Sequence, residues 1–142
     1  MIVDASVVID AVADPGARGA AARAALSAVP ATEPLLAPGH FAVEVMAGMR
    51  AAASRSNHPL AVSELPEALD DTEALGVVVE ATPWSDVRRG WELAQGSLLS
   101  VAAAVYVAAA ERHHMALLTA DTRIERSGAS INCQIITVTP GQ

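Results

Sequence analysis

The sequence contains no lysine, a single cysteine and very few aromatic residues. Cys133 alone cannot form an internal disulfide or a four-cysteine zinc site. Aromatic residues make up 3% of the chain, which argues against a base-stacking nucleic-acid module. No apolar run reaches the roughly 18–20 residues of a membrane span, and the N-terminus lacks the basic segment of a signal peptide. We therefore expect a protein of the reducing cytoplasm with no membrane partner.

The charge balance is acidic. All nine basic residues are arginine, against 16 aspartate and glutamate residues, so the formal net charge is −7. Proteins that bind nucleic acid by neutralising phosphates are usually basic. If this chain contacts nucleic acid, it needs metal ions, a local arginine patch or a partner chain to do so.

What the sequence does have is apolar material in an alternating pattern. It has 142 residues, of which 52% are hydrophobic, and this predicts one domain over residues 1–142 with its own core. Short apolar runs alternate with helical periodicity, which predicts an α/β fold of three layers, α/β/α, around a central parallel sheet. We expect strands at 2–3, 35–36, 77–82, 115–119 and 133–138, and helices over 7–13, 17–28, 39–55, 60–75, 84–95 and 100–114.

Some residues have expected structural roles. Ser6 and Ser100 are predicted to cap helices, and Gly48 is predicted to let another element approach its helix closely. Trp84 and Trp91 are seven positions apart, so they share one face of a helix, as core or dimer contacts. The strand at 77–82 is expected to be buried, and Cys133 is expected to be a buried strand residue.

Three acids are expected to meet at one edge of the sheet. Asp4 follows the first strand directly, and Asp121 follows the strand at 115–119 after one intervening alanine. Functional groups collect beyond the carboxyl ends of parallel strands. Glu44 lies on a strongly apolar helix, where a carboxylate needs a positive partner. Converging carboxylates repel one another unless they hold a cation, and oxygen ligands suit Mg²⁺ or Mn²⁺. Such an ion activates water and binds phosphate oxygens, which is the chemistry of phosphodiester hydrolysis.

Each of the three acids also has a plainer interpretation. Asp4 and Asp121 could be helix caps or turn residues, and Glu44 could pair with a surface arginine. The same holds for their neighbours: Ser6 could bind a substrate phosphate, and Thr119 could orient Asp121 or simply end a strand.

Two basic side chains have the same ambiguity. Arg123 could contact RNA phosphates or lie in a solvated loop. His40 could help hold a metal or phosphate, although capping or surface packing is the simpler role.

Four blocks of sequence carry a resemblance to a known family. They are MIVDASVVIDAV, APGHFAVEVMAGMRAA, SVAAAVYVAAAERHHMALLTADTRI and CQIITV, and they extend over nearly the whole chain. In this order they resemble the PIN-domain family, in particular VapC-type toxins of toxin–antitoxin modules. The ordered set is far more specific than any single block.

The resemblance implies a function and partners. It implies an Mg²⁺- or Mn²⁺-dependent endoribonuclease toxin that cuts tRNA or another structured RNA. Asp4 and Asp121 would bind the metal, with Glu44 as a third ligand or as the acid that orients the attacking water. The implied partners are a VapB-type antitoxin and a second copy of the chain, in a homodimer or a toxin–antitoxin hetero-oligomer.

One position departs from the family pattern. The family has S-V-x-D-A-x-Y in the third block, whereas this chain has Ala103 in place of the aspartate. If Ser100 is the N-cap, residue 103 is the third helical residue and faces the edge where Asp4 and Asp121 are expected. A deliberate inactivating substitution, natural degeneration or a shifted register would each explain the alanine; intact acids elsewhere favour the first. We expect weak metal binding and slow or no cleavage.

Two alternative functions stay open. The first is a catalytically dead PIN-like module that binds RNA or a partner without cutting. The second is a non-nuclease α/β domain of the receiver or phosphatase type, which also places an aspartate after its first strand. That type needs a lysine, and this chain has none.

Overall fold

Five short strands form one parallel sheet at the centre of the molecule. The computed structural model describes residues 1–141. The strands are Ile2–Val3 (β1), Leu36–Ala37 (β2), Val78–Val79 (β3), Leu117–Thr119 (β4) and Ile135–Thr137 (β5). The helices are Ala5–Ala13 (α1), Ala17–Ala28 (α2), Phe41–Ala53 (α3), Leu65–Ala74 (α4), Trp84–Ala94 (α5) and Val101–His113 (α6), with a 3₁₀ turn at Val62–Glu64.

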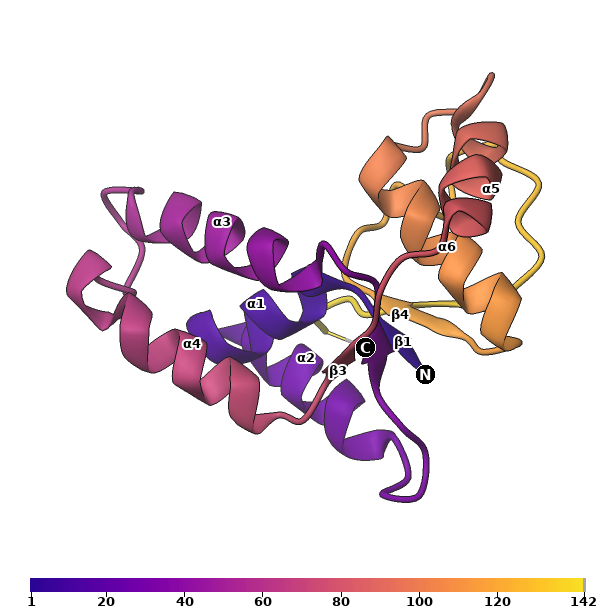
Figure 1. Cartoon of the computed structure of the whole chain (residues 1–142). Coiled ribbons are helices and arrows are strands. Elements are labelled where there is room, and N and C mark those ends of the chain that lie inside the picture. The colour runs from indigo at the N-terminus through magenta and orange to yellow at the C-terminus, as the bar shows by residue number, and fades with distance from the viewer. Residues whose placement is uncertain (142) are drawn as a thin grey trace.

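The strand order is β3-β2-β1-β4-β5, and every neighbouring pair is parallel. Helices α1 to α4 lie on one side of the sheet and α5 and α6 on the other (Figure 1). The predicted three-layer α/β architecture with a central parallel sheet is therefore confirmed. Because all strands run the same way, their carboxyl ends share one edge of the sheet.

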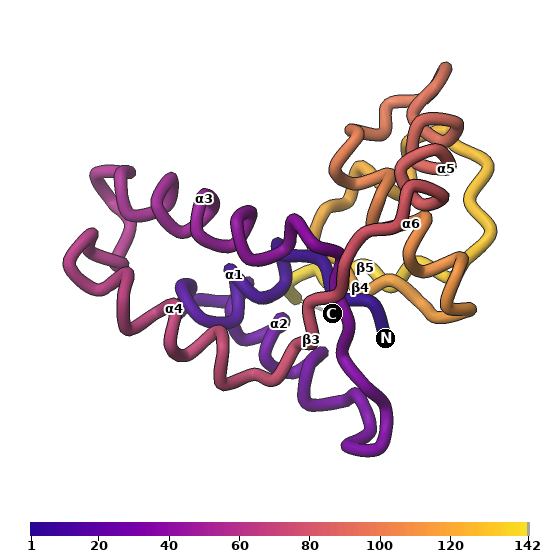
Figure 2. Tube along the Cα trace, in the orientation of Figure 1, coloured from indigo at the N-terminus to yellow at the C-terminus, as the bar shows by residue number. Residues whose placement is uncertain are grey.

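The chain changes sides after β3. Figure 2 shows it leaving the α1–α4 layer at β3 and crossing to α5 and then α6. Helix α6 ends at His113 just before β4, so its N-terminus lies at the carboxyl edge of the sheet. This crossing brings the first turn of α6 to the same edge as the end of β1.

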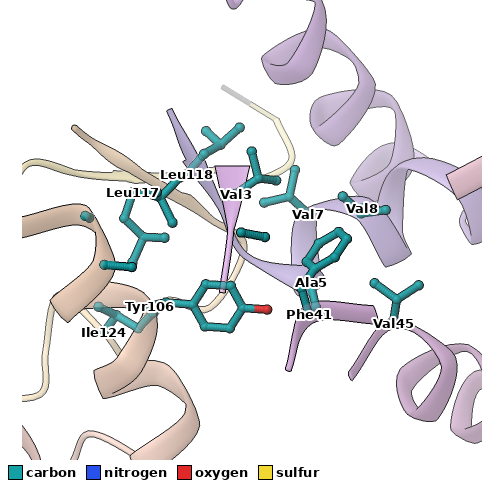
Figure 3. Close-up of a cluster of buried hydrophobic side chains, with 14 of the residues drawn as sticks. Val3, Ala5, Val7, Val8, Phe41, Val45, Tyr106, Leu117, Leu118 and Ile124 are labelled. Atoms are coloured by element: carbon teal, nitrogen blue, oxygen red, sulfur yellow. The ribbon is translucent and has the colours of Figure 1, made fainter. Parts of the chain in front are cut away.

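The core sits between the sheet and its two helical layers. Ile2 and Val3 of β1 and Leu117 of β4 are completely buried, and Figure 3 shows side chains of both strands packed against those of α1, α3 and α6. Residues 104–110 of α6 are all buried. A helix that is apolar on all sides has to be enclosed, which explains why this alanine-rich helix lies between the sheet and α5.

Several local predictions are confirmed. The second helix spans Ala17–Ala28, as expected. Ser100 is the N-cap of α6, where its Oγ accepts a hydrogen bond of 3.1 Å from the backbone N–H of Ala103. Gly48 faces Ile9 of α1 so closely that a Cβ atom would clash with the Ile9 side chain, so the predicted close approach of another element is present.

Other local predictions are wrong. The strand predicted at 77–82 is only Val78–Val79, and its side chains are exposed because β3 lies at the edge of the sheet. Trp84 and Trp91 are 76% and 64% exposed, so they are not core residues. Cys133 is partly buried and precedes β5 rather than lying in it. No helix among residues 1–141 has both the length and the hydropathy needed to cross a membrane.

Candidate active site

The central strand of the sheet, β1, positions Asp4. It directly follows β1, and its backbone N–H donates to the carbonyl oxygen of Leu118 across 2.9 Å. Its Oδ2 accepts hydrogen bonds from the hydroxyls of Ser6, at 2.9 Å, and Thr119, at 2.6 Å. Asp4 occupies the N-cap position of α1 but forms no side-chain cap hydrogen bond. Its carboxylate is therefore held toward β4 and not used as a helix cap.

Ser6 and Thr119 connect Asp4 to the turn after β4. The backbone N–H of Ala120 donates to Oγ of Ser6, and that of Asp121 donates to Oγ1 of Thr119, both at 3.0 Å. Ser6 lies inside α1, because the helix already begins at Ala5, so the prediction that it caps this helix is wrong. Thr119 does orient the Asp121 segment through this hydrogen bond. This is one of the two roles that the sequence suggested for Thr119.

Glu44 approaches from the first turn of α3. This helix follows β2 directly, and the backbone N–H of Gly39 donates to Oγ1 of Thr82 at 3.0 Å, which fixes the entry to the helix. Oε1 of Glu44 is buried, and within residues 1–141 it has no hydrogen-bond partner. The imidazole of His40 lies nearby, with its Nε2 3.5 Å from Oε1 of Glu44. No surface arginine pairs with Glu44 within the described chain, in contrast to the plainer interpretation.

Tyr106 completes this part of the site, and the sequence reasoning did not assign it a role. It extends from α6 toward the start of α1 and α3, with its hydroxyl on that side (Figure 3). Burial raises its pKa well above the usual value for tyrosine, and the nearby carboxylates of Glu44 and Asp4 raise it further. The tyrosine therefore faces both acids. A single polar ring in an otherwise apolar alanine helix was the signal that could have identified it.

His40 packs beside this ring. Its imidazole meets the Tyr106 ring edge to face, with centroids 4.8 Å apart and planes at 64°. Its Nε2 lies 3.2 Å from the carbonyl oxygen of Ala102. His40 is the N-cap residue of α3 without a side-chain cap bond, so it contacts α6 and Glu44 rather than its own helix end.

Asp121 is engaged by Arg123. Nε of Arg123 donates to Oδ1 at 2.9 Å, Nη2 donates to Oδ2 at 3.0 Å, and the backbone N–H of Arg123 donates to Oδ1 at 3.0 Å. These hydrogen bonds hold the pKa of the Asp121 carboxyl below its usual value. The last of them is the bond of an aspartate turn, so the plainer interpretation of Asp121 as a turn residue describes part of its geometry.

Ala103 shares a small pocket with this ion pair. The pocket measures about 30 Å³, and its walls include Ser100, Ala103, Asp121 and Arg123. Ala103 is the third residue of α6, because Ser100 is the N-cap. The methyl group of Ala103 therefore lies where a longer acidic side chain would reach the Asp121 side of the site.

The acids present do not form a complete metal site. Their donors are oxygen atoms, which divalent Mg²⁺ and Mn²⁺ prefer, and Oε1 of Glu44 is buried without a partner among the described residues. However, no three histidine, cysteine, aspartate or glutamate side chains within residues 1–141 are grouped closely enough to hold one ion. Both oxygens of Asp121 are also occupied by Arg123. The residues of this chain therefore do not fit a fully coordinated divalent ion.

The fold and the acids define the class of the protein. It is a small α/β domain with acids at the carboxyl ends of β1 and β4 and on the helix that follows β2. A family model described as the PIN domain matches residues 1–129, and the chain belongs to the PIN-domain family. No curated protein sequence matches it significantly.

Solved structures share the fold at low sequence identity. A toxin–antitoxin complex from Klebsiella pneumoniae has a chain with a TM-score of 0.67 and 22% identity, covering 96% of this chain and 95% of that one. The sarcin–ricin loop cleaving toxin VapC20 of Mycobacterium tuberculosis has a TM-score of 0.65 and 17% identity, with coverages of 90% and 95%. VapBC2 of Rickettsia felis, bound to a promoter DNA fragment, has a TM-score of 0.70 and 10% identity, with coverages of 97% and 98%.

Proposed function

We propose that this chain is a VapC-type PIN ribonuclease whose catalytic edge is incomplete at Ala103. The observation that carries the proposal is the arrangement around that position. Asp4 and Glu44 both face Tyr106, Asp121 is linked to Asp4 through Thr119, and Ala103 lines a pocket with Asp121. Three acids are retained at the edge, and the fourth position has no donor.

The retained residues have distinct proposed roles. Asp4 and Asp121 are the acids held by the sheet, and Glu44 is the acid held by α3. Ser6 and Thr119 fix the orientation of Asp4 through the hydrogen bonds at its Oδ2. With an aspartate at position 103, the carboxylates would provide an oxygen site for Mg²⁺ or Mn²⁺, an ion that lowers the pKa of bound water in phosphodiester hydrolysis.

The proposed substrate is a structured RNA such as tRNA, cut in a single-stranded loop. Unpaired loops expose their backbone and bases, whereas paired RNA keeps its major groove too narrow for side chains. The proposed inhibitor is a basic VapB-type antitoxin, since a chain with a net charge of −7 attracts a basic partner. The chains of the related structures are themselves parts of toxin–antitoxin assemblies.

We also propose a homodimer. Trp84, Val87 and Trp91 lie on one face of α5 and are all exposed. Large exposed apolar patches on soluble proteins usually mark contact surfaces. We propose this face as the contact between two copies, which agrees with the expectation that the two tryptophans form dimer contacts.

The substitution Ala103→Asp tests the proposed activity. We expect it to produce cleavage of a tRNA or a stem-loop RNA in Mg²⁺ or Mn²⁺, and EDTA or an added Asp4→Asn change to abolish that cleavage. Val101→Asp is the matched control: it adds the same charge to the first turn of α6, at a position that is 63% exposed. Cleavage products are resolved on denaturing gels.

The outcomes separate the two candidate functions. If A103D folds, binds Mn²⁺ and still cuts no RNA, the ribonuclease proposal is wrong. The second candidate is a binding module without catalysis, which is favoured by the alanine and by the Arg123 ion pair at Asp121. That module predicts RNA binding by the unchanged chain, and no gain of cleavage in A103D.

A further inference from the structure

The contact between Asp121 and Arg123 occupies the donor atoms that a cation would need. The guanidinium lies side-on to the carboxylate, with one N–H on each oxygen at 2.9 and 3.0 Å. This paired geometry matches the fork of arginine to the two oxygens of a carboxylate. A guanidinium stays protonated at every physiological pH, so this positive charge is permanent.

The alanine at position 103 leaves room for this ion pair. Ala103, Asp121 and Arg123 line one pocket of about 30 Å³. An acidic side chain at position 103 would place a second negative charge beside the guanidinium, and both acids would compete for one cation. With alanine at position 103, Arg123 is the charged partner of Asp121, and it lies two positions further along the chain.

We infer that Arg123 is an internal counter-ion that takes the place of a divalent ion at Asp121. This inference rests on the proposed function, because it concerns the cation site of that same edge. Divalent binding is then opposed twice in this chain: position 103 lacks a ligand, and the oxygens of Asp121 are already engaged. Asp4 and Glu44 are left as the only two acids of the site with oxygens available to a cation within residues 1–141.

The ion pair is a competitor rather than a permanent block. The side chain of Arg123 is 83% exposed, and solvent and salt weaken an exposed pair. A divalent ion can therefore displace the guanidinium when its other ligands are present. Removing the guanidinium should tighten Mn²⁺ binding by up to about fivefold, because the ion then no longer has to break an exposed ion pair in order to bind.

The test measures Mn²⁺ binding without RNA, from the loss of the free-ion signal in electron paramagnetic resonance. Arg123→Gln is made in the unchanged chain and in A103D, with folding checked by circular dichroism. We expect tighter binding in both backgrounds and the tightest in the double variant. Arg126→Gln is the matched control, since Arg126 is an exposed arginine three residues away and its loss changes net charge equally.

Asp121→Asn provides the decisive comparison. If Arg123 acts through Asp121, R123Q gives no gain of Mn²⁺ affinity once Asp121 is neutral. The inference is overturned if R123Q gains no more than R126Q, or if the gain persists in D121N. These outcomes are independent of RNA cleavage: A103D could bind Mn²⁺ and cut nothing, which would sink the ribonuclease proposal and leave the role of Arg123 intact.

Discussion

Thr119 donates its hydroxyl proton to Oδ2 of Asp4 across 2.6 Å, although the two residues are 115 positions apart in the sequence. The threonine is completely buried, and its own Oγ1 accepts a hydrogen bond of 3.0 Å from the backbone N–H of Asp121. One hydroxyl thus sets the orientation of two acids. Because it is both a donor and an acceptor, no apolar side chain of equal size can replace it.

The first prediction concerns this hydroxyl. Thr119→Val keeps the shape of the side chain but leaves an oxygen of Asp4 and the N–H of Asp121 without this partner. We expect a loss of about 2 kcal/mol in the free energy of unfolding, measured with urea. Thr137→Val is the control, because Thr137 pairs with Thr119 in the neighbouring strand and its hydroxyl bonds at an exposed site. Equal losses in the two variants would contradict the assignment.

The second prediction concerns a buried carboxylate on α5. The side chain of Asp86 is 4% exposed, and both its oxygens accept from Nε of Arg112, at 3.0 and 3.1 Å. Arg112→Met keeps the aliphatic stem but leaves this charge buried without the guanidinium. We expect a loss of about 3 kcal/mol in unfolding free energy.

A surface ion pair provides the comparison for Arg112. Arg18→Met removes a 3.5 Å pair with Asp10, in which the arginine is 63% exposed, and it should cost less than about 1 kcal/mol. A loss in R112M as small as that in R18M would show that Asp86 is solvated in the folded protein.

The third prediction concerns acid sensitivity. Partial burial acts to raise the pKa of Glu111, but hydrogen bonds from Arg89 and from the backbone of Asn132 outweigh it, and the pKa lies below the usual 4.5. A lowered folded-state pKa means that the ionised carboxylate stabilises the protein above about pH 4.5 and that this contribution is lost as the pH falls through the folded-state pKa.

Glu111→Gln should therefore be less stable than the unchanged chain at pH 7, and its stability should fall less on acidification. Urea midpoints between pH 7 and pH 3 measure the difference. Glu67→Gln, at an exposed position of α4, removes the same charge and serves as control. Parallel pH curves for E111Q and the unchanged chain would refute the prediction.

The fourth prediction concerns the tryptophan face of α5. Replacing both Trp84 and Trp91 by serine should change the free energy of unfolding little, since both side chains are mostly exposed. It should convert a dimer to a monomer in sedimentation equilibrium if this face joins two copies. Val62→Ser, which removes a 61% exposed apolar side chain from the 3₁₀ turn, should leave association unchanged. If the protein without substitutions is monomeric at all concentrations, the proposed contact is contradicted.

Much of the fold was predictable because apolar periodicity is a local property. The strand at Ile2–Val3, the helix at Ala17–Ala28 and the cap at Ser100 follow from their own few residues. The exposure of the β3 side chains was not predictable in this way. Its valines resemble a central strand, but the strand order places them at an edge, and that order depends on which strands pair.

The sequence predicted where the residues of the candidate site lie in the fold, but it did not predict which side chains contact one another. Asp4 and Thr119 lie at the carboxyl edge because parallel strands end there, and strand–helix alternation was visible in the sequence. The side-chain partners were not. The bidentate contact of Arg123 with Asp121 and the position of Tyr106 opposite Glu44 depend on rotamers and on packing between α3 and α6.

The pairing of β1 with β4 has a consequence for synthesis of the protein. Ile2 and Val3 align with Leu117 and Leu118, so the first strand finds this neighbour only after some 118 residues have been translated and the last of them has cleared the ribosome. Until then Asp4 has neither Thr119 nor Asp121 beside it. Nascent chains and fragments that stop before Leu117 therefore lack the assembled edge of the sheet.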